Sequence, residues 1–299
     1  MGEVAAAIFT THVPRLMIKD PEARKAYMGK NVTTFYQAME ELERKRLRDL
    51  EFDTFVLFDT HWFTTLDYVI NAHERLKGVY TSEELPEMIH EMPYDYPGDA
   101  ELARAIAKAA TGRGIHALAT SYRSMPVHYP TLNVMSYFNP DARRRVVSIG
   151  VCQTAEIHND LAFGAALAEA IRASNRRVVL IGAGGLSHKF WDYDHARERA
   201  SASPEDIATL TNRLYDERIM EWLRAGRHDQ VLHAAAEYRA QCSPEGRFSH
   251  YLMLAGAMSG ASWSWRGEQF GRYEAALGTG QAIFFFAPPR ESGATLVSA

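Results

Sequence analysis

The sequence predicts an α/β fold, in which a mixed sheet core is flanked by helices on both faces in three layers, α/β/α. Short apolar segments typical of buried strands alternate with segments of helical periodicity from one end of the chain to the other. No linker rich in Pro, Gly or Ser and no internal repeat interrupts this alternation. With 299 residues, the chain is long enough for one large α/β domain, and we expect a single domain over residues 1–299.

Six apolar segments are predicted as strands, because each is short and is followed by polar or turn-forming residues. They lie at residues 4–9, 55–58, 66–72, 146–151, 177–185 and 282–287. Five helices are predicted between them from apolar residues that recur every three or four positions. They cover about 32–50, 99–110, 159–174, a segment that begins at Ser203 and a last segment that begins near residue 244.

Local signals support two of these helices and argue against regular structure in one segment. The first helix has apolar residues at spacings of three and four, namely Val32, Phe35, Met39 and Leu42. The helix at Ser203 has a proline and two acids in its first turn; its apolar face would comprise Ile207, Leu210, Leu214 and Ile219. Residues 78–99 contain three prolines and no clear period, which predicts a loop-rich insertion.

Composition and charge exclude several classes of function. The net charge of −4 has no long basic run behind it, so we expect no nucleic-acid partner. No apolar run approaches the roughly 18 to 20 residues that span a bilayer, and the N-terminus lacks the basic region of a secretion signal. Cys152 and Cys242 are far apart, which fits a reducing compartment without disulfides. The expectation is a cytoplasmic enzyme or binding protein.

Three histidines follow predicted strands. His12 comes after the first strand, His61 after the second, and His188 after the strand at 177–185. Open α/β sheets bind ligands beyond the carboxyl ends of their strands, so these side chains are expected to meet at one edge. Neutral imidazole binds Zn and Fe(II), and its pKa near 6.5 suits proton transfer at neutral pH. The sequence therefore predicts a metal site at the strand ends.

A carboxylate would complete a site in which two histidines and one acid bind Fe(II) and leave positions open for substrate and oxygen. Spacing alone does not choose among Asp59, Glu237 and Glu245. Asp59 lies two residues before His61, so in an extended chain the two share a strand face. It is therefore also a candidate for orienting His61 from behind the metal.

Four segments of the sequence carry a family resemblance. They are TTHVPR (10–15), FDTHW (58–62), GGLSHKF (184–190) and SPEGRFSHYLMLAGAM (243–258). In combination they resemble the type III extradiol ring-cleaving dioxygenases, the family related to the catalytic subunit of protocatechuate 4,5-dioxygenase. The resemblance runs from about residue 4 to about residue 288. Within that family, the insertion after residue 78 and GTGQ (278–281) look most like the enzymes that act on 3,4-dihydroxyphenylacetate.

The resemblance implies a non-haem Fe(II) enzyme that uses O2 to split a catechol ring beside its two hydroxyls, giving a muconic semialdehyde. It implies His12 and His61 as metal ligands and Glu245 as the carboxylate ligand, because the family's glutamate precedes a glycine at the start of a late helix. Glu237 has no such match. The best candidate substrate is 3,4-dihydroxyphenylacetate, in the degradation of aromatic compounds, and a homo-oligomer, dimer or tetramer, is expected.

Four further residues receive roles from the resemblance. His188 matches the family's acid/base histidine, and Asp59 is expected to steady His61. His128, in PVHYPTL (126–132), matches a second pocket histidine that contacts substrate and is expected to be catalytic, and its neighbour Tyr129 is also expected to bind substrate. Arg15 departs from the family pattern, where a small residue is expected; it either meets a substrate carboxylate or faces solvent.

Two other functions stay open at this point. The first is a relative with another catecholic substrate, such as protocatechuate or DOPA, or one that carries Zn, since two histidines and a glutamate also suit Zn hydrolases. The second is a non-enzymatic metal- or ligand-binding protein of the Memo type. Oxygen consumption with simple catechols separates an enzyme from a binding protein.

Overall fold

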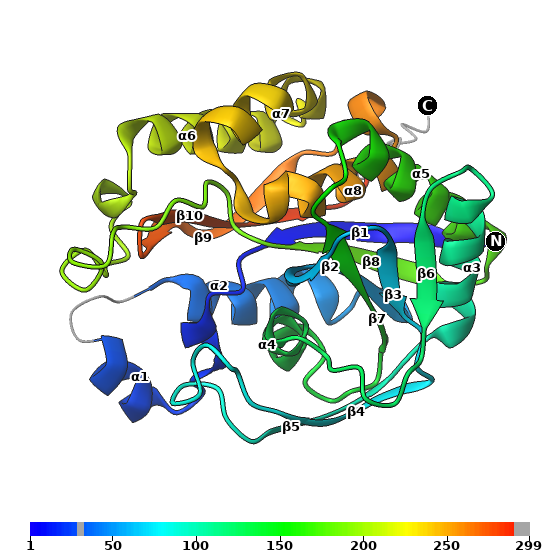
Figure 1. Ribbon diagram of the computed structural model, residues 1–299, viewed down its shortest axis with the longest axis horizontal. Coiled ribbons are helices and arrows are strands. Elements are labelled where there is room, and N and C mark those ends of the chain that lie inside the picture. Colours follow the sequence, from blue (N-terminus) through cyan, green and yellow to red (C-terminus); the bar gives the residue numbers. More distant parts are fainter. Residues whose placement is uncertain (29–32, 290–299) are drawn as a thin grey trace, which may run out of the picture.

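The computed structural model describes residues 1–28 and 33–289, arranged as a sheet between two helical layers (Figure 1). Eight strands form the sheet in the order β6-β3-β7-β2-β8-β1-β10-β9. Their bounds are β1 (Glu3–Thr10), β2 (Thr54–Thr64), β3 (Tyr68–Asn71), β6 (Ala117–Thr120), β7 (Arg145–Cys152), β8 (Arg177–Ala183), β9 (Gly267–Ala276) and β10 (Thr279–Phe286). The central strands β7, β2, β8 and β1 are parallel, whereas β10 and β9 extend the sheet in antiparallel fashion. The α/β fold class with a mixed sheet is confirmed.

Helices cover both faces of the sheet (Figure 1). One face carries α3 (Ala100–Thr111), α5 (Ile157–Ala173) and α8 (Ser249–Ala257), together with α6 (Leu210–Ala225) and α7 (His228–Cys242). The other carries α2 (Phe35–Leu42) and α4 (Tyr129–Phe138), with α1 (Pro21–Met28) beside them. A separate hairpin of β4 (Arg75–Tyr80) and β5 (Met92–Pro97) lies beyond α4.

Successive residues of the central strands point into two different cores. In β2, Val56 and Phe58 pack on the α5 side, while Phe55 and Leu57 pack on the α2 side. This alternation follows from the two-residue period of a strand, and burial on both faces explains the uninterrupted apolar run. Because these strands are parallel, their carboxyl ends lie together at one edge of the sheet, which is where the polar residues after each strand collect.

The expectation of a loop-rich insertion at 78–99 is wrong for the two ends of that segment, which form strands. Arg75–Tyr80 pairs with Met92–Pro97 as an antiparallel hairpin, and only residues 81–91 connect the two strands without regular pairing. A two-stranded ribbon tolerates proline because each strand has a free edge, where a missing N–H leaves no ladder bond unmade. Pro93 and Pro97 therefore did not exclude a strand here.

The helix expected from Ser203 begins later. Residues Pro204–Asp206 make a single 3₁₀ turn, in which the Ser203 hydroxyl accepts from the backbone N–H of Glu205 at 3.3 Å. The chain is then extended at Ile207, and α6 begins at Leu210. As a consequence, the expected apolar face is wrong in part: Leu210 and Leu214 are exposed, while Ile207 and Ile219 are buried.

The helices predicted at 99–110 and 159–174 are present as α3 and α5 with small shifts in their bounds, but the last predicted helix begins later than residue 244, as α8 at Ser249. The first predicted helix begins as α2 at Phe35 and continues as a π turn over Glu43–Leu47. Phe35, Met39 and Leu42 are fully buried, as their spacing predicted, and Val32 lies outside the described residues. Both cysteines are buried and unpaired. In the described part of the chain, every helix is too short or too polar to cross a bilayer.

Candidate functional site

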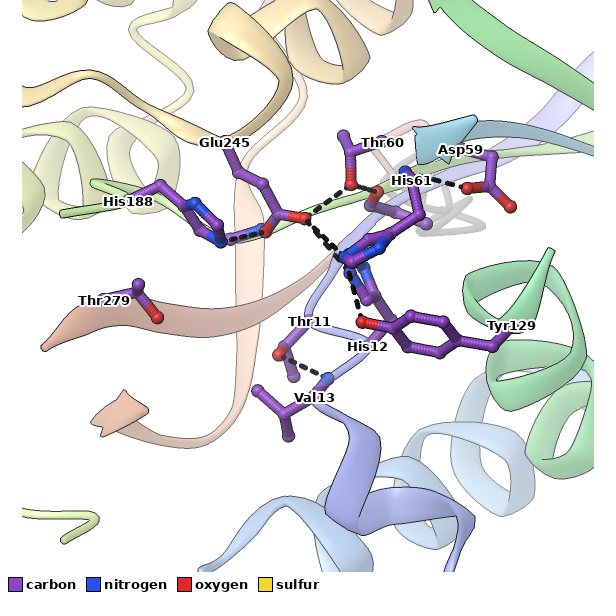
Figure 2. Close-up of polar contacts among 12 residues, drawn as sticks. Thr11, His12, Val13, Asp59, Thr60, His61, Tyr129, His188, Glu245 and Thr279 are labelled. Atoms are coloured by element: carbon purple, nitrogen blue, oxygen red, sulfur yellow. Dashed lines mark hydrogen bonds and ion pairs between the residues drawn. The ribbon is translucent and has the colours of Figure 1, made fainter. Parts of the chain in front are cut away.

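Two histidines and a glutamate converge at the carboxyl edge of the sheet. His12 follows β1, His61 lies near the end of β2, and Glu245 opens the short turn Glu245–Phe248 that precedes α8. Their ligand atoms all lie within 4.8 Å of one another. One glutamate oxygen, Oε1, faces both histidines (Figure 2); it is 3.0 Å from His12 Nε2 and 3.9 Å from His61 Nε2.

This group fits a divalent metal ion. For metal–ligand bonds of about 2.1 Å, neighbouring donor atoms lie roughly 3 Å apart, which matches the 3.0 Å between His12 and Glu245, while the whole group lies within 4.8 Å. His12 and Glu245 are each only 5% exposed and His61 is partly exposed, and two imidazoles with a carboxylate are the set that holds Fe(II) or Zn with open positions. Neither other candidate acid is part of this group: Glu237 is exposed on α7, and Asp59 binds backbone instead.

Glu245 is fixed from both sides. Oε1 accepts from the Thr60 hydroxyl at 2.6 Å, and Oε2 accepts from the backbone N–H of Gly185. A Cβ at position 185 would lie 2.6 Å from Gln281, so glycine lets the backbone pass close to that side chain while its N–H reaches the carboxylate. The turn itself is strained, because Arg247 and Phe248 both have left-handed backbone with φ of 56° and 63°.

The pKa values of Glu245 and of the histidines around it depend on one another. Burial alone would raise the pKa of Glu245, but His12 and His188 hold that pKa well below its usual value. Burial opposes the charged form of His12 as well, yet the Glu245 carboxylate outweighs it and raises the pKa of His12. The pKa of His61 falls to about 4, because it is buried and lies beside His12. The carboxylate is therefore ionised and His61 neutral, as metal ligands must be.

Asp59 supports His61 through the backbone. The spacing predicted that Asp59 and His61 share one face of a regular strand. The strand register shifts after Asp59, so this simple relation does not hold. Instead, the buried Asp59 carboxylate accepts from the backbone N–H groups of His61 at 3.0 Å and Trp62 at 3.2 Å. Its other oxygen accepts from the hydroxyl and the backbone N–H of Thr131 in α4. This arrangement fixes the bend that turns His61 toward Glu245.

A cavity of about 300 Å³ opens in front of the cluster. It is lined by His12, Val13, Pro14, Arg15, His61, Glu84, Leu85, Met88, Tyr129, His188, Phe190, Ala200, Ser201, Glu245, Ala276, Leu277, Thr279 and Gln281. The Tyr129 hydroxyl lies 2.9 Å from His61 Nε2. Arg15, expected either in the pocket or in solvent, lines the cavity and donates to the Ala275 carbonyl at 3.2 Å.

The two remaining predicted histidines differ in position. His188 reaches the cavity from the segment after β8, with Nε2 3.7 Å from Glu245 Oε2, on the opposite side of the carboxylate from His61 (Figure 2). Its side chain is 26% exposed, so a ligand in the cavity can touch it. His128 does not line the cavity; its ring stacks on Trp62 with centroids 5.8 Å apart.

Several cavity residues were not singled out individually in the sequence. Glu84, Leu85 and Met88 come from the loop of the β4–β5 hairpin, and Phe190 and Leu277 also line the cavity. Phe190 belongs to GGLSHKF and Thr279 to GTGQ, two segments that supported the family resemblance, and GTGQ also contains Gln281. Oε1 of Gln281 accepts from the Thr11 hydroxyl at 2.6 Å, next to His12.

Comparisons with known proteins match the chain along most of its length. Residues 6–286 match the family described as the catalytic LigB subunit of aromatic ring-opening dioxygenase. An Escherichia coli 3,4-dihydroxyphenylacetate 2,3-dioxygenase is 32% identical over 272 residues, which cover 88% of this chain and 95% of the relative. A 2-aminophenol 1,6-dioxygenase alpha subunit of Pseudomonas sp. is 27% identical over 86% of this chain and 92% of its own. The 2-aminophenol 1,6-dioxygenase beta subunit of Pseudomonas sp. is 23% identical over 94% of this chain and 93% of its own.

A solved structure resembles the fold. The crystal structure of an uncharacterized protein from Escherichia coli K12 aligns with a TM-score of 0.60, covering 94% of this chain and 99% of the other. At 16% sequence identity, this match supports the architecture alone.

Proposed function

The chain belongs to the family of the catalytic LigB subunit of aromatic ring-opening dioxygenase, and on that premise we propose that it opens a catechol ring beside the two hydroxyls. The product would be a muconic semialdehyde, and the first candidate substrate is 3,4-dihydroxyphenylacetate, on which a relative of 32% identity acts by name. Membership in a dioxygenase family sets aside the non-enzymatic binding protein. We take residues 1–299 to form a single catalytic domain.

The observation that carries the proposal is the convergence of His12, His61 and Glu245 at the floor of a cavity that also contains His188. We assign the metal as Fe(II), held by the two imidazoles and the carboxylate. When bound, Fe(II) would supply the redox chemistry that lets O2 react with an aromatic ring. The glutamate is ionised before the metal arrives, so its charge is available to a cation.

The protein's own contribution is proton transfer and exclusion of water. His188 Nε2 faces the cavity beside Glu245, where it would accept the proton of a catechol hydroxyl and return a proton once oxygen has entered the ring. Apolar side chains of Leu85, Met88 and Phe190 line the approach. A dry pocket strengthens each polar interaction inside it and protects reactive species from water.

The ring substituent would lie toward Arg15, which supports a preference for catechols with a short acidic side chain. Glu84 lines the same cavity from the hairpin loop, and this observation favours a second candidate. A catechol with an amino group, such as DOPA, would place its ammonium near Glu84 and its carboxylate near Arg15. The two candidates therefore differ in whether an ammonium raises or lowers kcat/KM.

The test is anaerobic loading of metal-free protein with Fe(II), followed by oxygen uptake with a panel of catechols. We expect uptake only with Fe(II), and the highest kcat/KM with 3,4-dihydroxyphenylacetate. DOPA tests the effect of an added ammonium group on kcat/KM, and 4-methylcatechol tests the effect of a substituent without charge. Full activity of metal-free protein would refute the assignment of the metal site; Zn-loaded protein is the control and should take up no oxygen, because Zn has no redox chemistry.

We also propose that the protein is a homo-oligomer, a dimer or a tetramer. Two relatives are named as alpha and beta subunits, which supports association within this family. Light scattering of the purified chain measures the mass directly, and a mass of about one chain would contradict the proposal.

A further inference from the structure

A buried carboxylate lies behind His188 and outside the cavity. Asp216, on α6, is fully buried and accepts four hydrogen bonds. One oxygen accepts from the backbone N–H of Ser187 at 3.1 Å and from the Tyr238 hydroxyl at 2.6 Å. The other accepts from the Ser187 hydroxyl and from the Tyr273 hydroxyl, both at 2.7 Å. All four donors are neutral groups.

Burying the Asp216 carboxylate among neutral donors costs free energy. Burying a carboxylate is unfavourable unless its hydrogen bonds compensate, and burial raises the pKa of Asp216 to about 6 against the effect of its donors. An apolar residue would fill the space between α6, α7 and β9 without that cost. Half of the hydrogen bonds go to one residue, Ser187, and that residue directly precedes His188.

The segment around Ser187 connects the acid/base histidine to the metal ligand. On one side, Ser187 and Leu186 exchange backbone hydrogen bonds with Gly280 of β10, each at 2.8 Å. On the other side, the backbone N–H of Glu245 donates to the Leu186 carbonyl at 3.0 Å. In the middle of this segment, Asp216 accepts hydrogen bonds from both the backbone N–H and the side-chain hydroxyl of Ser187.

The glycine at position 280 is explained by the same carboxylate. A Cβ built on Gly280 would lie 1.9 Å from Oδ2 of Asp216, so the carboxylate packs against bare backbone of β10. Gly280 therefore belongs to the support of the 186–188 segment, and a larger residue there would push Asp216 off Ser187.

We propose that Asp216 is a positioning residue that sets the orientation of His188 through Ser187. The inference rests on the proposed function, in which His188 transfers protons to and from the ring substrate. Misplacing a reacting group by about 1 Å can cost about 10²-fold in rate, and the rigid connection from α6 prevents such a shift. Asp216 itself touches neither the cavity nor the metal ligands.

The first test is a double-mutant cycle on turnover. Asp216→Asn should lower kcat about 10- to 100-fold and leave KM and Fe(II) affinity within about twofold, because only the proton-transfer group moves. In the background of His188→Phe, the same substitution should have no further effect on kcat. Ser187→Ala should act in the same direction but more weakly, since it keeps the backbone donor.

Asp99→Asn is the matched control. Asp99 is also a buried carboxylate with several hydrogen bonds, but it caps α3 and pairs with Arg176 at the opposite edge of the sheet from the cavity. It should lower the melting temperature without changing kcat. Tyr273→Phe removes one donor to Asp216 and serves if Asp216→Asn does not fold; it should lower kcat by less than tenfold and only when His188 is present.

A readout independent of activity separates this inference from the proposed function. The NMR signals of the His188 ring, assigned by their loss in His188→Phe, should shift in Asp216→Asn and stay in place in Asp99→Asn. If wild-type protein consumes no oxygen with any catechol, the proposed function fails while the ring signals still test the positioning. Equal losses of kcat by Asp216→Asn with and without His188, or unshifted ring signals, would overturn the inference.

Discussion

Histidine is used in two opposite ways in this molecule. At the cavity, His12 and His61 surround one carboxylate oxygen of Glu245, and His188 approaches the other. In the core, His228 at the start of α7 has no exposed surface and stacks on Trp263 with centroids 3.5 Å apart. One of its ring nitrogens lies 2.9 Å from a tyrosine hydroxyl, and the other lies 2.9 Å from a backbone carbonyl.

Burial lowers the pKa of the imidazole in both settings, as it does for His61, and only a close carboxylate reverses its effect. Burial dominates at His228 and lowers its pKa to about 4, and both ring nitrogens are already hydrogen-bonded. At His12, the Glu245 carboxylate overcomes burial and raises the pKa. A shared carboxylate and an open cavity therefore distinguish a functional histidine from one that completes a core. Substitutions at the cavity should abolish chemistry and spare the fold, whereas substitutions at His228 should do the reverse.

The largest effect is expected from the metal ligands. His12→Ala, His61→Ala and Glu245→Ala should each lose most metal affinity, and with it turnover, while the fold stays largely intact. If three ligands share a binding free energy on the order of 10 kcal/mol, removing one costs roughly 3 kcal/mol, or more than about 10²-fold in affinity. Titration with Fe(II) under anaerobic conditions measures this loss.

The control for the ligand variants is Glu237→Ala, because Glu237 is an exposed acid on α7. It should bind Fe(II) as wild-type protein does. Loss of iron in Glu237→Ala together with its retention in Glu245→Ala would show that the third ligand is misassigned.

The next largest effect is expected at His188, which lines the cavity but is proposed to transfer protons instead of binding metal. His188→Phe should keep Fe(II) and fold normally, while kcat falls by about 10² to 10⁴, the usual contribution of a positioned acid/base group. Iron content, melting temperature and kcat are measured on the same preparation. Lost iron would make His188 a ligand; a normal kcat with a lower melting temperature would make it a structural residue like His228.

A smaller effect is expected at Arg15, on the cavity wall away from the ligands. A charge-assisted hydrogen bond contributes roughly 1.5 to 3 kcal/mol, so Arg15→Met should lower kcat/KM for 3,4-dihydroxyphenylacetate about 10- to 100-fold. The same variant should treat 4-methylcatechol as wild-type protein does. Equal losses for both substrates would mean that Arg15 supports the cavity without contacting a substituent.

No effect on turnover is expected at His228, where the effect should be on stability. Its pKa is about 4 in the folded protein and near 6.5 in the unfolded chain, so only the unfolded chain gains a proton between these values. Its contribution to stability is therefore complete above about pH 6.5 and falls as the pH is lowered toward 4, by at most about 3 kcal/mol. Urea unfolding at pH 7 and pH 5 should show a smaller acid loss in His228→Gln than in wild-type protein. An identical loss in both would mean that another group dominates.

Much of the fold could be predicted from the sequence because buried parallel strands are uninterrupted apolar runs. The runs before His12, His61 and His188 mark where each strand ends, and parallel strands bring those ends to one edge. The β4–β5 hairpin could not be predicted in this way, since its strands are partly exposed and β5 contains two prolines. The start of α6 depends on pairing between Ala208 and Gly278, a contact that no local pattern contains.

Less of the site than of the fold could be predicted from the sequence. Spacing could not choose Glu245 over Glu237 or Asp59, because Glu245 reaches the histidines through a left-handed turn that is set by tertiary contacts. The family resemblance pointed to Glu245, and the geometry places it beside both histidines. Nor could the sequence show that His228 belongs to the core, since its partners Trp263 and Tyr251 lie more than 20 residues away.

The central claim is that the cluster around Glu245 supports insertion of O2 into a catechol ring beside its hydroxyls. The most direct test is to run Fe(II)-loaded protein with 3,4-dihydroxyphenylacetate under ¹⁸O2 and identify the product by mass spectrometry and absorbance. We expect a ring-opened semialdehyde that carries ¹⁸O in its new carboxylate, formed with one O2 consumed for each ring opened. A dicarboxylate from cleavage between the hydroxyls, or a product without ¹⁸O, would contradict the claim.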